Sequence, residues 1–173
     1  KTVENLIALV SKNFRISQRF FKLQAKIQKE KKINFADRNA KMGEVKKKFT
    51  FVETCELVMQ SCAEVDPKYS AILKSYLENG QIDVYPKQGK RAGAYCSGGG
   101  DLPTYIMLNH TDDMRSYETL AHEMGHAFHT ELSRVQPFHY RDYTMSVAEV
   151  ASTFFEQVAL TKLEKVLDEK DYL

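Results

Sequence analysis

The sequence lacks several features that would assign a chain to a protein class at once. No segment approaches the roughly 18 consecutive apolar residues of a membrane-spanning helix, and no basic start leads into an apolar segment with a cleavage site. Proline and glycine number only 4 and 8 among 173 residues, which excludes a collagen-like chain. These absences predict a protein without a membrane partner, and they make the cytoplasm the expected location.

Cysteine is also scarce. Cys55, Cys62 and Cys96 are odd in number, and no two of them have C-x-x-C spacing, so we expect free thiols and not a disulfide scaffold. Apolar residues make up 43% of the chain and charged residues 28%, close to globular averages, which excludes wholesale disorder. The chain is therefore expected to fold around a core.

The charges are distributed unevenly along the chain. Residues 1–50 carry 14 Lys and Arg against 4 Asp and Glu, whereas residues 101–173 carry 6 against 13. A basic end can bind nucleic acid, but Lys46, Lys47 and Lys48 have no aromatic residues between them. We therefore expect no nucleic-acid partner.

Length and chain ends suggest one folded region of a longer protein. At roughly 150 residues per domain, 173 residues predict one unit, which we divide into a helical arm over 1–48 and a core over 49–173. The first residue is not Met, and the last six residues still have a helical pattern without a stop signal. We expect a fragment.

The periodicity of apolar residues predicts a mainly α fold. One long amphipathic helix is expected over residues 4–29, followed by a connector over 31–48 with one helical turn. Further helices are expected at 50–65, 67–79, 116–134 and 146–167, the first of them opened by a capping box of Thr50 and Glu53. Two or three short strands are expected between Gly80 and Asn109, around 82–85 and 105–108.

The helix predicted over 116–134 contains the letters H-E-M-G-H at residues 122–126. Positions i and i+4 lie on one face of a helix, so His122 and His126 can bind one zinc ion. Glu123 projects to a neighbouring direction, where its carboxylate can reach a water molecule as a general base. The pattern predicts a zinc cleft bounded by long helices, with the small sheet before the zinc-binding helix.

A catalytic zinc usually has a third protein ligand, which spacing alone does not identify. The acidic candidates are Glu131, Glu149, Glu156, Glu164 and Glu169. Glu149 has small neighbours that allow another helix to approach, but Ser146 and Glu149 also fit an ordinary capping box. Glu156, two turns after Glu149, could hold a ligating histidine from behind, or it could be a solvated surface residue.

Three segments resemble the thimet oligopeptidase-like zinc peptidases, most closely their bacterial branch, oligoendopeptidase F. They read G-K-R-A-G-A-Y at 89–95, Y-E-T-L-A-H-E-M-G-H-A-F-H at 117–129, and Q-P-F-H-Y at 136–140 followed by A-E-V-A-S-T-F-F-E at 148–156. The resemblance implies Glu149 as the third ligand, a mostly helical fold beside a deep cleft, and oligopeptide substrates. It also implies further transition-state stabilisers after Leu173 and a further N-terminal lobe, so the chain alone is expected to be less active.

The same resemblance suggests substrate contacts. Gly93, Ala94 and Tyr95 could form a sheet edge that pairs with the peptide backbone, or an ordinary hairpin. His139 and Tyr140 could contact the substrate carbonyl, or belong to a structural loop.

The sequence therefore predicts a zinc metalloendopeptidase in which Glu123 takes a proton from the attacking water. Two alternatives remain open. One is a deformylase-like hydrolase with Cys96 as the third ligand, although its flanks A-Y-C-S-G do not resemble that family, and the other is a non-catalytic zinc-binding fragment.

Overall fold

The computed structural model describes residues 1–40 and 47–167 of the chain, apart from the side chain of Asn39. Residues 41–46 of the connector expected over 31–48, and the candidate ligand Glu169, lie outside the described residues. The described residues divide into two compact units, 1–40 and 47–167. The boundary expected after residue 48 stays a prediction.

The first unit contains two helices where one was expected. Helix α1 spans Thr2–Lys12 and α2 spans Phe14–Ile27, and a 3₁₀ turn, η1, covers Ala36–Asn39. The single helix is wrong because the chain breaks at Asn13, whose side-chain Nδ2 donates to the Leu9 carbonyl at 2.9 Å. An asparagine side chain that bonds the backbone competes with the helical ladder.

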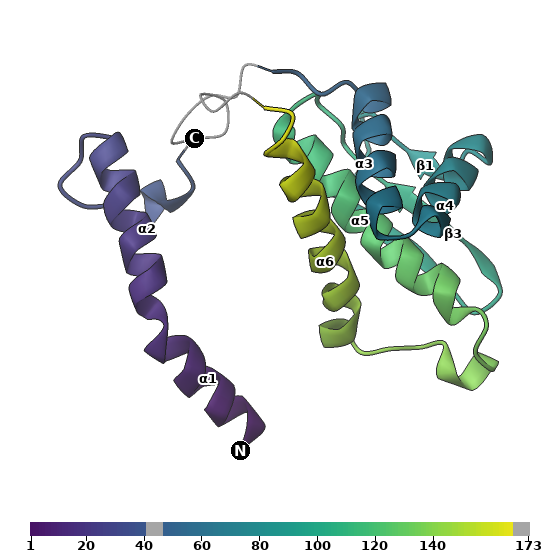
Figure 1. The fold of residues 1–173 in the computed structure, drawn as a ribbon, viewed down its shortest axis with the longest axis horizontal. Helices are drawn as coiled ribbons and strands as arrows, with labels where there is room; N and C mark the ends of the chain where they lie inside the picture. Colours follow the sequence, from purple (N-terminus) through teal and green to yellow (C-terminus); the bar gives the residue numbers. More distant parts are fainter. Residues whose placement is uncertain (41–46, 168–173) are drawn as a thin grey trace. The chain divides into compact units, whose positions relative to one another are not determined.

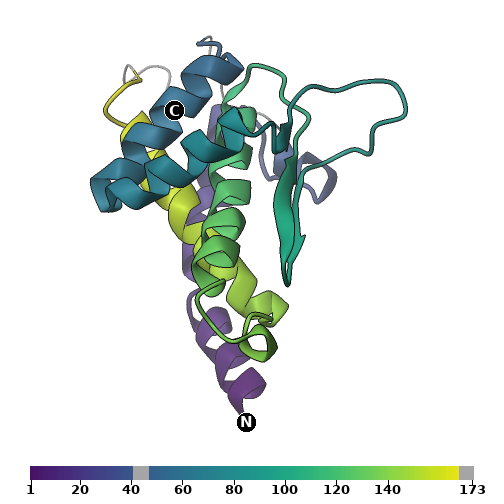
Figure 2. The same ribbon diagram turned by 90° about the vertical axis from the view of Figure 1, so that its right-hand side faces the viewer.

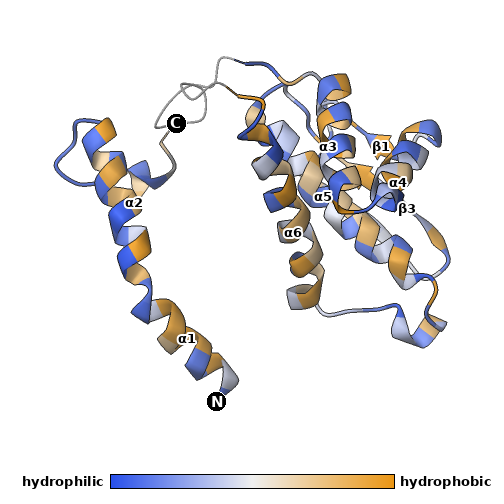
Figure 3. Ribbon diagram, viewed as in Figure 1, coloured by the Kyte–Doolittle hydropathy of each residue, from blue (hydrophilic) through white to orange (hydrophobic). Residues whose placement is uncertain are grey.

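The α2 helix is fixed to its own return loop by a buried glutamine. Gln24 Nε2 donates to the carbonyls of Asp37, Arg38 and Ala40 at 3.2–3.3 Å. Most apolar side chains of α1 and α2 are nonetheless exposed. Figure 3 shows that apolar residues occur along both helices.

In the second unit, two antiparallel neighbours come first: α3 spans Phe51–Val65 and α4 spans Pro67–Glu78. Thr50 accepts the Glu53 N–H at α3, as expected, and Asp66 accepts the Lys68 N–H at α4. The Glu53 carboxylate pairs with Lys47 and does not complete the predicted capping box. Gly80 ends α4 with a φ of 64°, a left-handed conformation that glycine adopts without strain.

A small sheet follows, as predicted, with strands β1 (Ile82–Asp83), β2 (Tyr95–Gly99) and β3 (Leu102–Met107). Their order is β1-β3-β2, and β3 pairs in parallel with β1 and antiparallel with β2. Val84 and Tyr85, which were expected to be in a strand, lie after β1 because the chain leaves the ladder at Asp83.

Two long helices complete the unit: α5 spans Met114–Ser133 and α6 spans Met145–Leu163, with the 3₁₀ turn η2 (Phe138–Tyr140) between them. Figure 1 shows α5 and α6 side by side, and Figure 2 shows the sheet on the other side of α5. Large, fully buried side chains come from these helices, α3, α4 and β3, and also from the segments before α3 and after β3: Phe49, Val58, Leu73, Ile106, Leu108, Tyr117, Leu120, Met124, Phe128 and Leu163. The mainly α fold with a small sheet before the motif helix is confirmed.

Candidate active site

The α5 helix carries the H-E-M-G-H motif and begins at a strong cap. Asp113 Oδ1 accepts the Ser116 N–H at 2.7 Å and the Ser116 hydroxyl at 2.8 Å. Further along α5, the His122 and His126 rings lie on the same face of the helix, with ring centroids 5.0 Å apart and ring planes at 85°. The helix therefore presents two imidazoles to the same neighbour, as their spacing predicted.

That neighbour is α6, which approaches α5 closely at Gly125. A Cβ atom at position 125 would lie 2.6 Å from the Ser152 Cα and 2.7 Å from the Ala151 carbonyl oxygen, distances that only a glycine avoids. The small residues of α6 were noted in the sequence, but their partner inside the motif was not. This contact sets the distance from α6 to the two histidines.

The close approach brings Glu149 to both rings. Its Oε2 lies 3.4 Å from His122 Nε2 and 3.8 Å from His126 Nε2, and the three ligand atoms all lie within 4.8 Å of one another. Ligands placed about 2.0–2.2 Å from a tetrahedral zinc are roughly 3.3–3.6 Å apart, so the residues present fit such an ion.

The carboxylate of Glu149 is oriented by its own helix. Ser152 Oγ donates to Glu149 Oε2 at 2.8 Å. The capping box considered for Ser146 and Glu149 is wrong, because α6 begins after Thr144 and Ser146 lies inside the helix, with its hydroxyl 3.1 Å from the Thr144 hydroxyl.

Glu156 lies behind the first histidine. Its Oε2 is 3.0 Å from His122 Nδ1, the ring nitrogen that is not near Glu149. The side chain is half-buried, so it is not the solvated surface residue that was the alternative.

Burial alters the proton affinity of two groups in the motif. Burial raises the pKa of Glu123, which is 6% exposed, and the nearby Glu149 carboxylate raises it further, while His122 and the Cys96 backbone N–H oppose the shift. Burial likewise lowers the pKa of His126, against the attraction of Glu149. His126 therefore favours the neutral form that binds a metal, and Glu123 favours the protonated form more than an exposed glutamate does.

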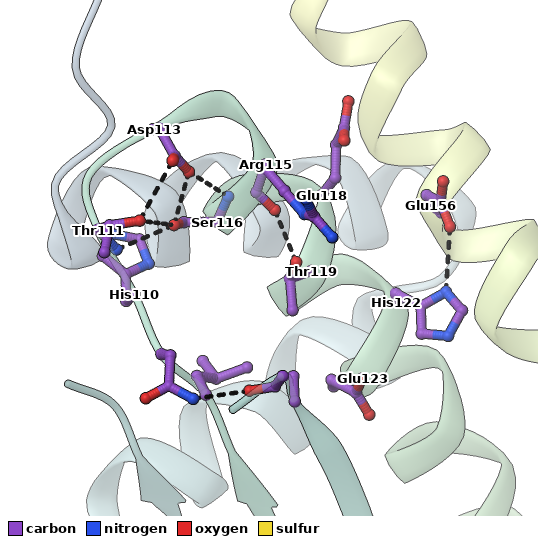
Figure 4. A pocket seen from close by; sticks show the side chains of 14 residues that line it. His110, Thr111, Asp113, Arg115, Ser116, Glu118, Thr119, His122, Glu123 and Glu156 are labelled. Atoms are coloured by element: carbon purple, nitrogen blue, oxygen red, sulfur yellow. Dashed lines mark hydrogen bonds and ion pairs between the residues drawn. The ribbon is translucent and has the colours of Figure 1, made fainter. Parts of the chain in front are cut away.

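A cavity of about 480 Å³ adjoins the motif (Figure 4). His122, Glu123 and Glu156 line it, together with Gly93 and Ala94 from the segment before β2. Tyr95 begins β2, which lies at the edge of the sheet, and it does not line the cavity. The structure thus brings two of the three expected backbone-binding residues to the site.

The two other expected substrate contacts lie elsewhere in the unit. His139 and Tyr140 are in η2, both are exposed, and neither lines the cavity beside His122.

The cysteines take structural positions. Cys96 packs against the core from β2, and burial raises the pKa of its thiol to about 12, which disfavours the thiolate that a metal requires. Within the described residues, the one group that could hold a metal contains Glu149 and not Cys96. Cys55 and Cys62 are buried and free, as expected.

Sequence reasoning missed the close contact at Gly125 and the hydrogen bond from Ser152 to Glu149, and it did not consider Glu118. Glu118 lines the cavity one helical turn before His122, and that i, i+4 spacing was the signal that could have found it.

The model of Peptidase family M3 matches residues 1–173, and the chain therefore belongs to this family. Oligopeptidase PepF of Bacillus subtilis (strain 168) is 34% identical over 98% of this chain and 26% of its own length. Group B oligopeptidase PepB of Streptococcus agalactiae is 31% identical over 97% of this chain and 28% of its own length. The resemblance inferred from the three segments is confirmed.

Solved structures agree on the fold. The crystal structure of a protein from Chlamydophila abortus has a TM-score of 0.82 and 33% identity, covering 97% of this chain and 28% of that one. The structure of PZ peptidase A with an inhibitor has a TM-score of 0.75 and 21% identity, covering 92% and 30%. The chain spans roughly a quarter of the length of the relatives it matches. Among the helices that the structure describes, none combines the length and apolarity needed to cross a membrane.

Proposed function

We propose that this chain is the zinc-binding catalytic region of a metalloendopeptidase that cleaves oligopeptides. The observation that carries the proposal is the convergence of His122, His126 and Glu149 within 4.8 Å, with Glu123 next to His122 on the same helix. Two imidazoles and a carboxylate are a donor set typical of catalytic zinc, which leaves a fourth position open. The names of the relatives, which are oligopeptidases, support peptides as the substrates.

The residues then divide the chemistry. When bound, zinc supplies a Lewis acid that polarises the scissile carbonyl and stabilises the negative charge that develops there. Glu123 accepts a proton from the attacking water at its carboxylate and donates that proton to the nitrogen of the leaving amine. Its raised pKa suits the first of these steps, because a carboxylate with a pKa closer to neutrality is a stronger base towards the proton of the attacking water.

Three more groups support the reaction. Glu156 accepts a hydrogen bond from His122 Nδ1–H, which directs Nε2 towards Glu149. Gly93 and Ala94 border the cavity before an edge strand, where a peptide backbone can pair with the chain. His139 and Tyr140 as substrate contacts, and a cytoplasmic location, stay predictions.

The deformylase-like alternative loses its basis, because Cys96 is outside the metal-ligand group of the described residues and the family is a peptidase family. The experiment described next distinguishes the peptidase from the second alternative, a non-catalytic zinc-binding fragment.

The test is Glu123→Gln in the protein expressed from its complete gene. We expect full zinc content and a kcat on a quenched fluorescent peptide that is lower by about 10²–10⁴, the usual contribution of a positioned proton acceptor. Glu56→Gln, an exposed change of the same kind, is the control and should leave kcat unchanged. Unchanged turnover by Glu123→Gln with zinc retained would show a metal site unconnected with hydrolysis.

A further inference from the structure

The cavity beside the motif is lined by charged side chains that have no role in the proposed cleavage reaction. From α5 it is lined by Glu123, His122 and Glu118, which Figure 4 shows, and Gly93 and Ala94 line it from the segment before β2. If the proposed function holds, a peptide that pairs near Gly93 and is cut beside Glu123 places a neighbouring side chain in this cavity. The wall residues on α5 then meet that side chain.

Glu118 is on this wall. It lies four residues before His122, so both side chains share a face of α5, as Figure 4 shows with Glu156 across from them on α6. Two other carboxylates of the cavity have side-chain or backbone partners: Asp113 accepts from Ser116, and Glu156 contacts His122, while Glu123 is assigned to the cleavage reaction. Within the part of the chain that the structure describes, Glu118 has no hydrogen bond or ion pair.

The surroundings of Glu118 disfavour its negative charge. Burial raises the pKa of Glu118, the Glu156 carboxylate raises it further, and Arg115 opposes these effects incompletely. Arg115 is exposed and forms no ion pair with Glu118 within 4.0 Å. A half-buried carboxylate with unused acceptor positions and a negative neighbour is stabilised by a cation that enters the cavity.

We propose that Glu118 binds a cationic side chain of the oligopeptide, Lys or Arg, and that it gives the peptidase a preference for a basic residue next to the cleaved bond. This inference rests on the proposed function. Because a hydrogen-bonded charged group contributes about 1.5–3 kcal/mol, the preference attributable to Glu118 should be at least roughly tenfold.

The experiment compares matched N-acetylated peptides that carry lysine or norleucine at each position flanking the cut. For the protein expressed from its complete gene, kcat/KM should favour the lysine peptide, and Glu118→Gln should lower the lysine to norleucine ratio about tenfold. The dissociation constants of the same peptides are measured in the Glu123→Gln background, with and without Glu118→Gln, so that binding is read separately from turnover. The same ratio should fall there.

Glu78→Gln, an exposed glutamate change on α4, is the control for net charge and should leave the ratio as in the wild type. An unchanged ratio in Glu118→Gln, or an equal loss for both peptides, would overturn the proposal. A lysine preference that requires a free N-terminus would also overturn it, because the cavity would then bind the terminal ammonium. If no peptide is cleaved by the wild type, the proposed function has failed first, and the binding measurements decide the role of Glu118.

Discussion

The carboxylate of Glu156 lies 3.0 Å from His122 Nδ1, while Nε2 of the same ring faces Glu149. A single residue on α6 thus fixes both the tautomer and the direction of a predicted ligand without entering the ligand group itself. The loss of such a contact is therefore expected to lower the affinity for the metal.

We therefore expect Glu156→Ala to weaken zinc binding about 10–100-fold, as is typical when the partner of a ligating histidine is removed. Competition with a chelator of known affinity measures the change. Glu156→Gln keeps an acceptor oxygen and should lose less. The exposed neighbour Gln157→Ala is the control, and equal affinity for Glu156→Ala and Gln157→Ala would contradict the role given to Glu156.

At the scale of elements, the site depends on how closely α5 and α6 pack. Gly125 permits the contact, and Tyr117 reinforces it through a hydrogen bond from its hydroxyl to the Ala159 carbonyl at 2.9 Å. The two helices contribute the histidines and Glu149 respectively, so their separation determines whether the ligands converge.

Gly125→Ala should therefore damage both stability and metal binding. The added Cβ meets backbone atoms of α6, and overpacking of this kind costs about 1–3 kcal/mol of the free energy of unfolding. Denaturant unfolding of the metal-free protein and zinc titration measure the two effects. Gly99→Ala, where no atom lies within 4 Å of the new Cβ, is the matched control; a wild-type stability and affinity for Gly125→Ala would mean that α6 can move away freely.

For the whole molecule, a metal that joins α5 to α6 links binding to folding. Zinc at 100 times its dissociation constant should add about 2.7 kcal/mol to the free energy of unfolding, because the unfolded chain does not assemble the three ligands. Thermal unfolding with zinc and after treatment with a chelator should show a higher Tm in zinc.

Two variants make this measurement specific. Glu149→Ala should lose the zinc-dependent rise in Tm, whereas Cys96→Ala should keep it. The reverse result would return Cys96 to the ligand set and remove Glu149 from it.

Local chemistry explains what the sequence could predict about this protein. His122, Glu123 and His126 followed from the fixed geometry of one helix, and α3 and α4 followed from their caps at Thr50 and Asp66. The small sheet followed from strand formers between turn residues. The helix expected over 4–29 failed because the apolar period continues across Asn13, while the break comes from a side-chain hydrogen bond that periodicity does not reveal.

Only the tertiary structure decided the rest. Glu149 and Glu156 were two of several acidic residues after the motif, and they face His122 because α6 packs against α5 at Gly125. Glu118 is distinguished by two tertiary facts: it lines the cavity, and among the described residues its carboxylate has no hydrogen bond or ion pair. The physical reason is that spacing along a chain fixes relations within a helix, whereas contacts between residues distant in sequence depend on the packing distance of two helices, which steric detail sets.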